Sequence, residues 1–265
     1  MTTSSLSPTW PVDAAYQPRS SWRGITAFLA TVAIFGVSAG VGVVVALALE
    51  QMTGLPWFGV PPDIDRAMEE GPYGFFLVTQ IGLQASVVVL TMWLAGRYAA
   101  SSFQALSLTP ARGGAMAYVK GMAVVLLVGC LYSTVLFIVT PETVAQDIKP
   151  YMGMATSDAA WLLAFIVAVG APLSEELLFR GFLLSALAQT PLGFVGASVI
   201  TTALWAALHA QYSVAGLIAV FLLGLTFCWL LWRTGSLWVP IVCHGIYNAL
   251  VLALVWAMAT GLVVI

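Results

Sequence analysis

Long apolar segments separated by short polar connections run along almost the whole chain. Most are at or near the ~20 residues that an α-helix needs to cross the hydrocarbon core of a bilayer. Seven such segments lie at residues 25–49, 73–94, 117–139, 159–187, 193–209, 214–232 and 237–265. Because lipid offers no hydrogen bonds to the backbone, continuous apolar segments of this length favour helices. The pattern predicts an all-α, polytopic membrane protein with about seven transmembrane helices.

Composition agrees with this fold class. The chain has 265 residues, of which 61% are hydrophobic and only 8% are charged, whereas soluble domains carry about 25% charged residues. The net charge of −2 is too small to indicate a nucleic-acid partner. Cys130, Cys228 and Cys243 lie apart in three predicted spans, which indicates neither a disulfide framework nor a zinc-binding spacing.

The polar connections define the domain organisation and the orientation. Residues 1–21 are polar and lack the apolar core of a signal peptide, so we expect a disordered cytoplasmic tail followed by a single multi-pass domain over 22–265. Acidic loops are predicted at 50–72 and 140–158, and a short interfacial helix within 97–114. The basic residues on the side of the N-terminus are Arg19, Arg23, Arg97, Arg112, Lys120 and Arg233, against Arg66 and Lys149 on the other side. The positive-inside rule then predicts a cytoplasmic N-terminus and an external C-terminus.

The first span also carries small residues one helical turn apart. Gly36 and Gly40 form a small-xxx-small pattern, which lets two membrane helices approach closely. We expect this face to pack against another helix of the same chain.

The span over residues 159–187 contains an unusual group of ionisable side chains. Glu175, Glu176 and Arg180 fall where hydrocarbon would surround a lipid-facing helix, at a cost of at least ~2.5–3.5 kcal/mol per charge. Glu176 and Arg180 are four residues apart with the acid first, a spacing that favours an ion pair on one helix face. Glu175 is rotated about 100° from that face, so it is available for another role.

Two further spans carry the only histidines of the chain. His209 ends the sequence Trp-Ala-Ala-Leu-His at residues 205–209, and His244 begins His-Gly-Ile-Tyr-Asn at residues 244–248, which puts Asn248 one turn away on the same face. Amide hydrolysis requires a base that activates water and donors for the developing oxyanion. Glu175 and His209 fit the first role, and His244 and Asn248 fit the second. Alternatively, Glu175, His209 and His244 are three ligands of a catalytic zinc ion, and this alternative stays open.

A joint site requires the three spans to bring these residues to one depth. Along straight helices, Glu175 lies near the middle of the membrane, His244 nearer the cytoplasmic side and His209 nearer the outer side. Helix tilt, a break at Pro172, or a fifth span that stops short would reconcile the three depths.

Together these motifs resemble those of the CPBP family, the CAAX proteases and bacteriocin-processing enzymes also called Abi proteins. The resemblance lies in the Glu175-Glu176-x-x-x-Arg180 sequence, an aromatic residue four positions before His209, and His244-x-x-x-Asn248, and it covers residues 155–255. Trp205 stands where the family usually has Phe. The resemblance implies a four-helix catalytic core and an intramembrane endopeptidase related to type II CAAX prenyl endopeptidases. It also implies water activation by Glu175 and His209, an oxyanion site at His244 and Asn248, and a supporting pair at Glu176 and Arg180. The cofactor is either absent or Zn²⁺.

The expected activity is therefore hydrolysis of a peptide bond at or near the membrane surface. The partners would be a membrane-associated protein or peptide substrate and the lipid bilayer, with no nucleic acid. The expected location is a bacterial cytoplasmic membrane. A non-enzymatic scaffold or immunity protein that keeps the polar cluster for helix packing is the competing class, and a transporter is third because no inverted repeat is visible.

Overall fold

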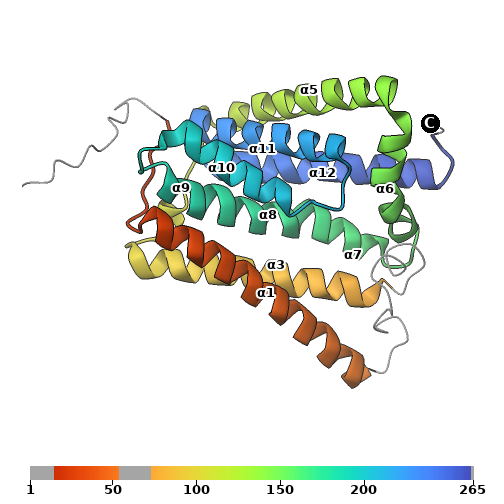
Figure 1. Cartoon of the computed structure of the whole chain (residues 1–265), viewed down its shortest axis with the longest axis horizontal. Coiled ribbons are helices and arrows are strands. Elements are labelled where there is room, and N and C mark those ends of the chain that lie inside the picture. Colours follow the sequence, from red (N-terminus) through yellow and green to blue (C-terminus); the bar gives the residue numbers. More distant parts are fainter. Residues whose placement is uncertain (1–14, 54–72, 264–265) are drawn as a thin grey trace, which may run out of the picture.

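The computed structural model describes residues 15–53 and 73–263 (Figure 1), and all regular structure within these ranges is helical. This confirms the predicted fold class. The long elements are α1 (Gly24–Thr53), α3 (Gly74–Tyr98), α5 (Ala115–Val139), a central helix over Ala160–Leu187, α10 (Gly193–Ala207), α11 (Val214–Thr234) and α12 (Trp238–Ala259). Two helices, α4 (Ser102–Ala105) and α6 (Pro141–Ala155), lie in connections.

Six of these helices in the described residues are long and apolar enough to cross a membrane. The predicted fifth span is the exception, because α10 has only 15 residues. At 1.5 Å per residue it is about 22 Å long, which is short of the ~30 Å hydrocarbon core. The sequence overestimated this span because its apolar composition continues to Leu208 although the helix has already ended.

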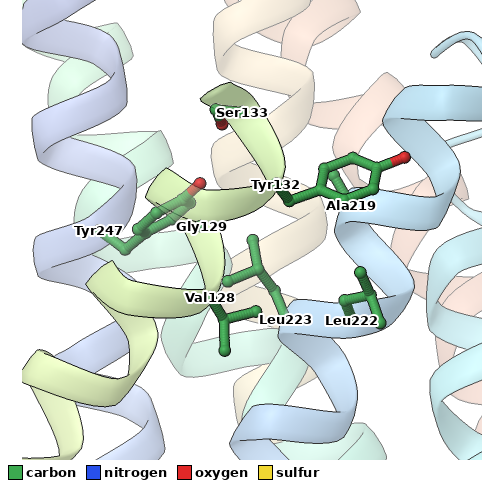
Figure 2. Close-up of a pocket in the computed structure, with 8 residues that line it drawn as sticks. All are labelled: Val128, Gly129, Tyr132, Ser133, Ala219, Leu222, Leu223 and Tyr247. Atoms are coloured by element: carbon green, nitrogen blue, oxygen red, sulfur yellow. The ribbon is translucent and has the colours of Figure 1, made fainter. Parts of the chain in front are cut away.

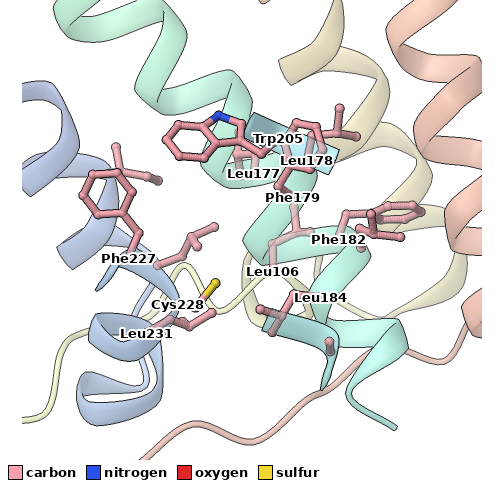
Figure 3. Packing of buried hydrophobic residues seen from close by; sticks show 14 of the residues in the cluster. Leu106, Leu177, Leu178, Phe179, Phe182, Leu184, Trp205, Phe227, Cys228 and Leu231 are labelled. Carbon is pink, nitrogen blue, oxygen red and sulfur yellow. The ribbon is translucent and has the colours of Figure 1, made fainter. Parts of the chain in front are cut away.

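The central helix contacts α1, α3, α10 and α12, so its side chains form much of the core. Figure 3 shows part of this core, in which Phe179 and Leu184 of the central helix belong to one cluster with Trp205 of α10 and with Phe227 and Leu231 of α11, whereas Phe182 points to the side away from α11. The α1 and α12 helices begin at the same end of the bundle, and the C-terminus lies at the opposite end (Figure 1).

Two π-helical segments interrupt the central helix. It consists of α7 (Ala160–Phe165), η2 (Ile166–Gly170), α8 (Ala171–Glu175), η3 (Glu176–Leu183) and α9 (Leu184–Leu187). Pro172 has no backbone N–H, and the Ala171 N–H donates to Ile166. The Val167 carbonyl is therefore left without a donor from its own helix and is free for a side chain from a neighbouring element.

Two connections differ from their predictions. The acidic segment predicted as a loop over 140–158 is mostly α6, which starts with Pro141 at its first turn and tolerates Pro150 inside. Its mixed polar and apolar sequence is that of an amphipathic helix, which lies across the end of the bundle (Figure 1). The predicted short helix within 97–114 is confirmed as α4. The predicted loop at 50–72 lies largely outside the described residues.

The N-terminal segment packs on the bundle where it is described. Residues 15–21, part of the predicted disordered tail, are non-helical, and Tyr16 and Ser20 are buried. Trp22 stacks on Phe182 with ring centroids 4.6 Å apart, and the Gln189 amide donates to the Ser20 carbonyl at 2.9 Å. These contacts hold the segment against the central helix. Residues 1–14 lie outside the described ranges.

The predicted packing face at Gly36 and Gly40 is wrong, because both positions face open space. The close approach of α1 to α3 occurs instead at Gly42, where an added Cβ would lie 2.3 Å from the Thr79 carbonyl oxygen. Gly82 of α3 meets Gly42 from the other side. A helix rotates by about 100° per residue, so glycines two and six positions away from Gly42 face elsewhere.

We therefore expect Gly42→Val to destabilise the protein by about 1–3 kcal/mol, the usual cost of overpacking. The measurement is the unfolding transition in detergent. Gly36→Val is the matched control, because it makes the same change in the same helix where the space is open, and it should change stability by less than ~0.5 kcal/mol. Equal effects of the two variants would contradict the α1–α3 contact.

Candidate active site

Glu176 and Arg180 form an ion pair that is completely buried. Arg180 Nη1 donates to Glu176 Oε1 at 3.0 Å, and both side chains have zero exposure. The pair lies within η3 and confirms the i,i+4 spacing expected from the sequence. A buried ion is costly unless its partners satisfy it, so the surroundings of this pair determine how the helices pack.

Arg180 is enclosed by groups from two other helices. Its Nη2 donates to the Gly224 carbonyl of α11 at 3.3 Å, and its guanidinium lies 4.3 Å from the ring centroid of Trp205 on α10. Gly224 permits this approach, since a Cβ there would be 2.8 Å from Arg180 Nη2. Carbonyl and aromatic groups thus replace water around the cation.

His244 of α12 joins the same carboxylate. Its Nδ1 lies 3.1 Å from Glu176 Oε1, and because a carboxylate can only accept, Nδ1 carries the proton. The His244 ring stacks on Phe227 with centroids 4.7 Å apart. Glu176 therefore orients the imidazole and leaves Nε2, which makes no hydrogen bond within the described part of the chain, for another group.

Glu175 takes a different partner, as its rotation from Glu176 predicted. The indole Nε1 of Trp205 donates to Glu175 Oε2 at 2.6 Å, and the carboxyl group is only partly buried. Glu175 Oε1 accepts no hydrogen bond from the described residues. The first acid of the motif, Glu175, is thus held at one oxygen and available at the other.

His209 lies next to this carboxylate through the same tryptophan. Its ring centroid is 5.1 Å from that of Trp205, and its Nδ1 donates to the Trp205 carbonyl at 3.1 Å. A carbonyl can only accept, so Nδ1 holds the proton and Nε2 of the neutral ring is an acceptor. A group in this state can take a proton from water.

Asn248 uses the carbonyl that the π segment leaves free. Its Nδ2 donates to Val167 O at 3.0 Å, which fixes the amide on α12 against η2. Gly245 makes this contact possible, because a Cβ there would lie 2.4 Å from the Ala168 carbonyl oxygen. One of the two amide hydrogens is thereby used, and the second remains for a ligand.

The structure therefore brings five of the predicted residues, Glu175, Glu176, Arg180, His209 and His244, into one cluster at the contact of the central helix, α10 and α12. Asn248 lies one helical turn beyond His244 on α12 and contacts Val167. Trp205 is central, because its ring also lies 5.6 Å from His244. A short fifth helix was one of the three expected ways to bring Glu175, His209 and His244 to one depth in the membrane. The structure shows such a helix, because α10 ends beside Glu175. Three residues that surround the cluster had no role assigned from the sequence, namely Trp205, Gly224 and Phe227. The only sequence signal for any of them was the aromatic residue of the motif four positions before His209, which is Trp205.

Polar residues continue from the cluster to α6. Tyr212 stacks beside His209 at 5.8 Å and donates to the Tyr151 hydroxyl of α6 at 3.2 Å. Asp147 accepts from the Ser213 backbone N–H and hydroxyl, both at 2.8 Å. Burial raises the pKa of Tyr212 well above its usual range, and the neighbouring Tyr151 and then the charges of Asp147 and Glu175 raise it further, so its phenol stays protonated and can donate.

The described residues contain no group of three or more His, Cys, Asp or Glu side chains arranged to hold a metal ion. The candidate ligands Glu175, His209 and His244 each direct one polar atom at another protein group, namely Trp205 Nε1, Trp205 O and Glu176. Each of the three keeps a second atom, Glu175 Oε1 or an imidazole Nε2, that makes no hydrogen bond within the described residues. A histidine that ligates a metal commonly donates its other ring N–H in this way, so these contacts fit the zinc-dependent alternative as well as the metal-free one.

A small cavity lies elsewhere, between α5, α11 and α12 (Figure 2). Its wall is apolar apart from Tyr132, Ser133 and Tyr247, and none of the clustered residues lines it. Tyr132 donates to the Ala215 carbonyl at 2.8 Å, which links α5 to the start of α11. The cavity is separate from the polar cluster.

Comparison with known proteins gives one finding. Residues 157–250 match the family model described as type II CAAX prenyl endopeptidase Rce1-like. This region contains all six predicted site residues, from Glu175 to Asn248, and the match confirms the family resemblance of their motifs. Neither the curated proteins nor the solved structures gave a match.

The buried pair leads to a stability prediction. Arg180→Ala leaves the Glu176 carboxylate buried without its main partner, and breaking such a pair costs about 3–5 kcal/mol. Unfolding in detergent should shift accordingly. Arg233→Ala is the matched control, because Arg233 is exposed at the end of α11 and its loss should cost less than ~0.5 kcal/mol. If Arg180→Ala unfolds like wild type, the pair does not stabilise the bundle.

Proposed function

We propose that this protein hydrolyses a peptide bond of a membrane-associated substrate. Its residues 157–250 match the Rce1-like family of type II CAAX prenyl endopeptidases. Membrane-spanning helices and the family support an integral CAAX-type protease in general. The assignment of individual residues to steps is our proposal. It rests on one observation: Glu175, His209, His244 and Asn248 each keep a polar atom or amide hydrogen that makes no hydrogen bond within the described chain.

Glu175 and His209 are the proposed water-activating pair. Trp205 holds both, through its indole N–H to Glu175 and its carbonyl to His209. Glu175 Oε1 and His209 Nε2 remain as two acceptors that can bind one water molecule and remove its proton as it attacks the carbonyl carbon. The proton then passes to the leaving amine, which completes hydrolysis.

His244 and Asn248 are the proposed donors to the oxyanion. Asn248 has a free amide hydrogen after its bond to Val167 O, and His244 Nε2 can donate when the ring is doubly protonated. Glu176 acts through His244 as a positioning residue, because its carboxylate fixes the Nδ1 side of the ring. Donors fixed before reaction stabilise developing charge without reorganisation.

Glu175→Gln should lower turnover by about 10²–10⁴, because it keeps the size and hydrogen bonding of the side chain but removes the base. Asn248→Ala should lower it by ~10²–10³ if the amide serves the oxyanion. The assay uses the protein in liposomes with fluorogenic peptides, some lipidated at a C-terminal Cys and some with an apolar helix followed by a polar tail.

Glu142→Gln is the matched control, since the same change is made at an exposed glutamate of α6, and turnover should be unchanged. The non-enzymatic scaffold expects no hydrolysis of any peptide. It also expects the phenotype of a deletion strain to be rescued by Glu175→Gln, and full rescue by this variant would end the protease proposal.

A metal-free reaction predicts that turnover survives removal of divalent ions. Asn248 shares a helix face with His244, which suits a pair of oxyanion donors better than a metal ligand beside an uninvolved amide. We therefore expect a chelator to leave the rate unchanged and elemental analysis to find no stoichiometric zinc. Zinc that is bound in a 1:1 ratio and lost in His244→Ala would instead establish the zinc-dependent alternative.

A further inference from the structure

The two ends of the helix bundle differ in charge. Hydrogen bonds join the segments that carry the arginines, since the Arg112 backbone N–H donates to the Thr234 carbonyl and the Ser21 hydroxyl donates to the Tyr98 carbonyl. One end of the bundle, which we call the arginine end, therefore carries five arginines: Arg19, Arg23, Arg97, Arg112 and Arg233. At the opposite end, α6 and the turn that follows it carry Glu142, Asp147 and Asp158, with only Lys149 as a base in the described residues.

The polar cluster is closed toward the arginine end. Beyond Glu176, the residues Leu177, Phe179 and Phe182 are all buried. The N-terminal segment covers this side, because Trp22 stacks on Phe182 and its Nε1 donates to the Phe182 carbonyl at 3.3 Å. Within the described part of the chain, buried apolar side chains thus separate Glu175 from the arginine end.

On the side that faces α6, the side chains next to the cluster are polar and partly exposed. Glu175, His209, Tyr212 and Tyr151 are each partly exposed, and they follow one another from the central helix through the 208–213 connection to α6. Hydroxyl groups link the last two of them. The exposed polar groups of the cluster thus all lie on the side away from the arginines.

The short α10 explains how a polar route can exist at this depth. The helix starts near the arginine end, where Gln189 contacts Ser20, and it stops after 15 residues. The non-helical residues 208–213 complete the distance to Ser213, which is bound to Asp147. Non-helical backbone at membrane depth is tolerated where it is buried in protein or lines a wet cavity.

We infer that the site opens on the face of the membrane opposite the arginine end, so that its substrate is a peptide presented outside the cytoplasm. The positive-inside rule assigns the arginine end to the cytoplasm, and the polar route leads to the other end. This inference rests on the proposed function, and it specifies the substrate class: the polar segment next to the cut bond has been translocated or secreted.

The test is the labelling of single cysteines by a membrane-impermeant thiol reagent, in spheroplasts and in inverted vesicles. Cys130, Cys228 and Cys243 are first replaced by Ala. His209→Cys reports on the site, and Gln211→Cys, exposed in the same connection, reports on the loop if the first variant folds poorly. Ala115→Cys, exposed at the first residue of α5 by the arginine end, is the control from the opposite side.

We expect His209→Cys and Gln211→Cys to react in spheroplasts, and Ala115→Cys to react only in inverted vesicles. The reverse pattern would overturn the inference, and so would a Gln211→Cys that reacts from outside while His209→Cys does not. Labelling requires no turnover, so an inactive protein would contradict the proposed function and leave this result standing. Reversed labelling with intact hydrolysis would contradict only the location of the opening.

Discussion

The buried carboxylate of Glu176 is the constraint on which the rest of this structure depends. One oxygen, Oε1, accepts from both Arg180 and His244, and Arg180 in turn requires the Gly224 carbonyl and the Trp205 ring. Charges at this depth are tolerated only with such partners. The contacts of one ion pair therefore fix the central helix, α10, α11 and α12 relative to one another. The candidate catalytic groups lie on these helices or, in the case of His209, directly after α10.

The π segments complete this arrangement. An α-helix throughout would have used the Val167 carbonyl within its own ladder, whereas the widened turn before Pro172 leaves it for Asn248. The same region accommodates Gly245 against the Ala168 carbonyl. A π segment at a functional site thus has a specific effect here, because it converts a backbone carbonyl into an anchor for a side chain on α12.

Much of the fold and of the candidate site could be predicted from the sequence, and the failures have physical causes. Apolar length identified the six long helices, and helical spacing separated the roles of Glu175 and Glu176, because both follow from local geometry. The end of α10 could not be predicted, since Leu208 continues the apolar composition of the helix while its backbone has turned. The packing of α1 could not be predicted either. Gly36, Gly40 and Gly42 are equivalent small residues in the sequence, and only the position of α3 determines which of them it contacts. The contact of His244 with Glu176 joins residues 68 positions apart, which no local pattern reports.

Trp205 connects the structural pair to the proposed chemistry. A phenylalanine, the usual residue of the motif that this sequence resembles, would keep an aromatic ring over Arg180 and beside both histidines. It would offer no N–H to Glu175. With tryptophan, the residue that covers the buried guanidinium also holds the carboxylate of the proposed base at 2.6 Å. The position of Glu175 is thereby tied to the packing of the Glu176–Arg180 pair, so a change that loosens the pair also displaces the base. In this chain the stability of the core and the geometry of the site depend on the same indole ring.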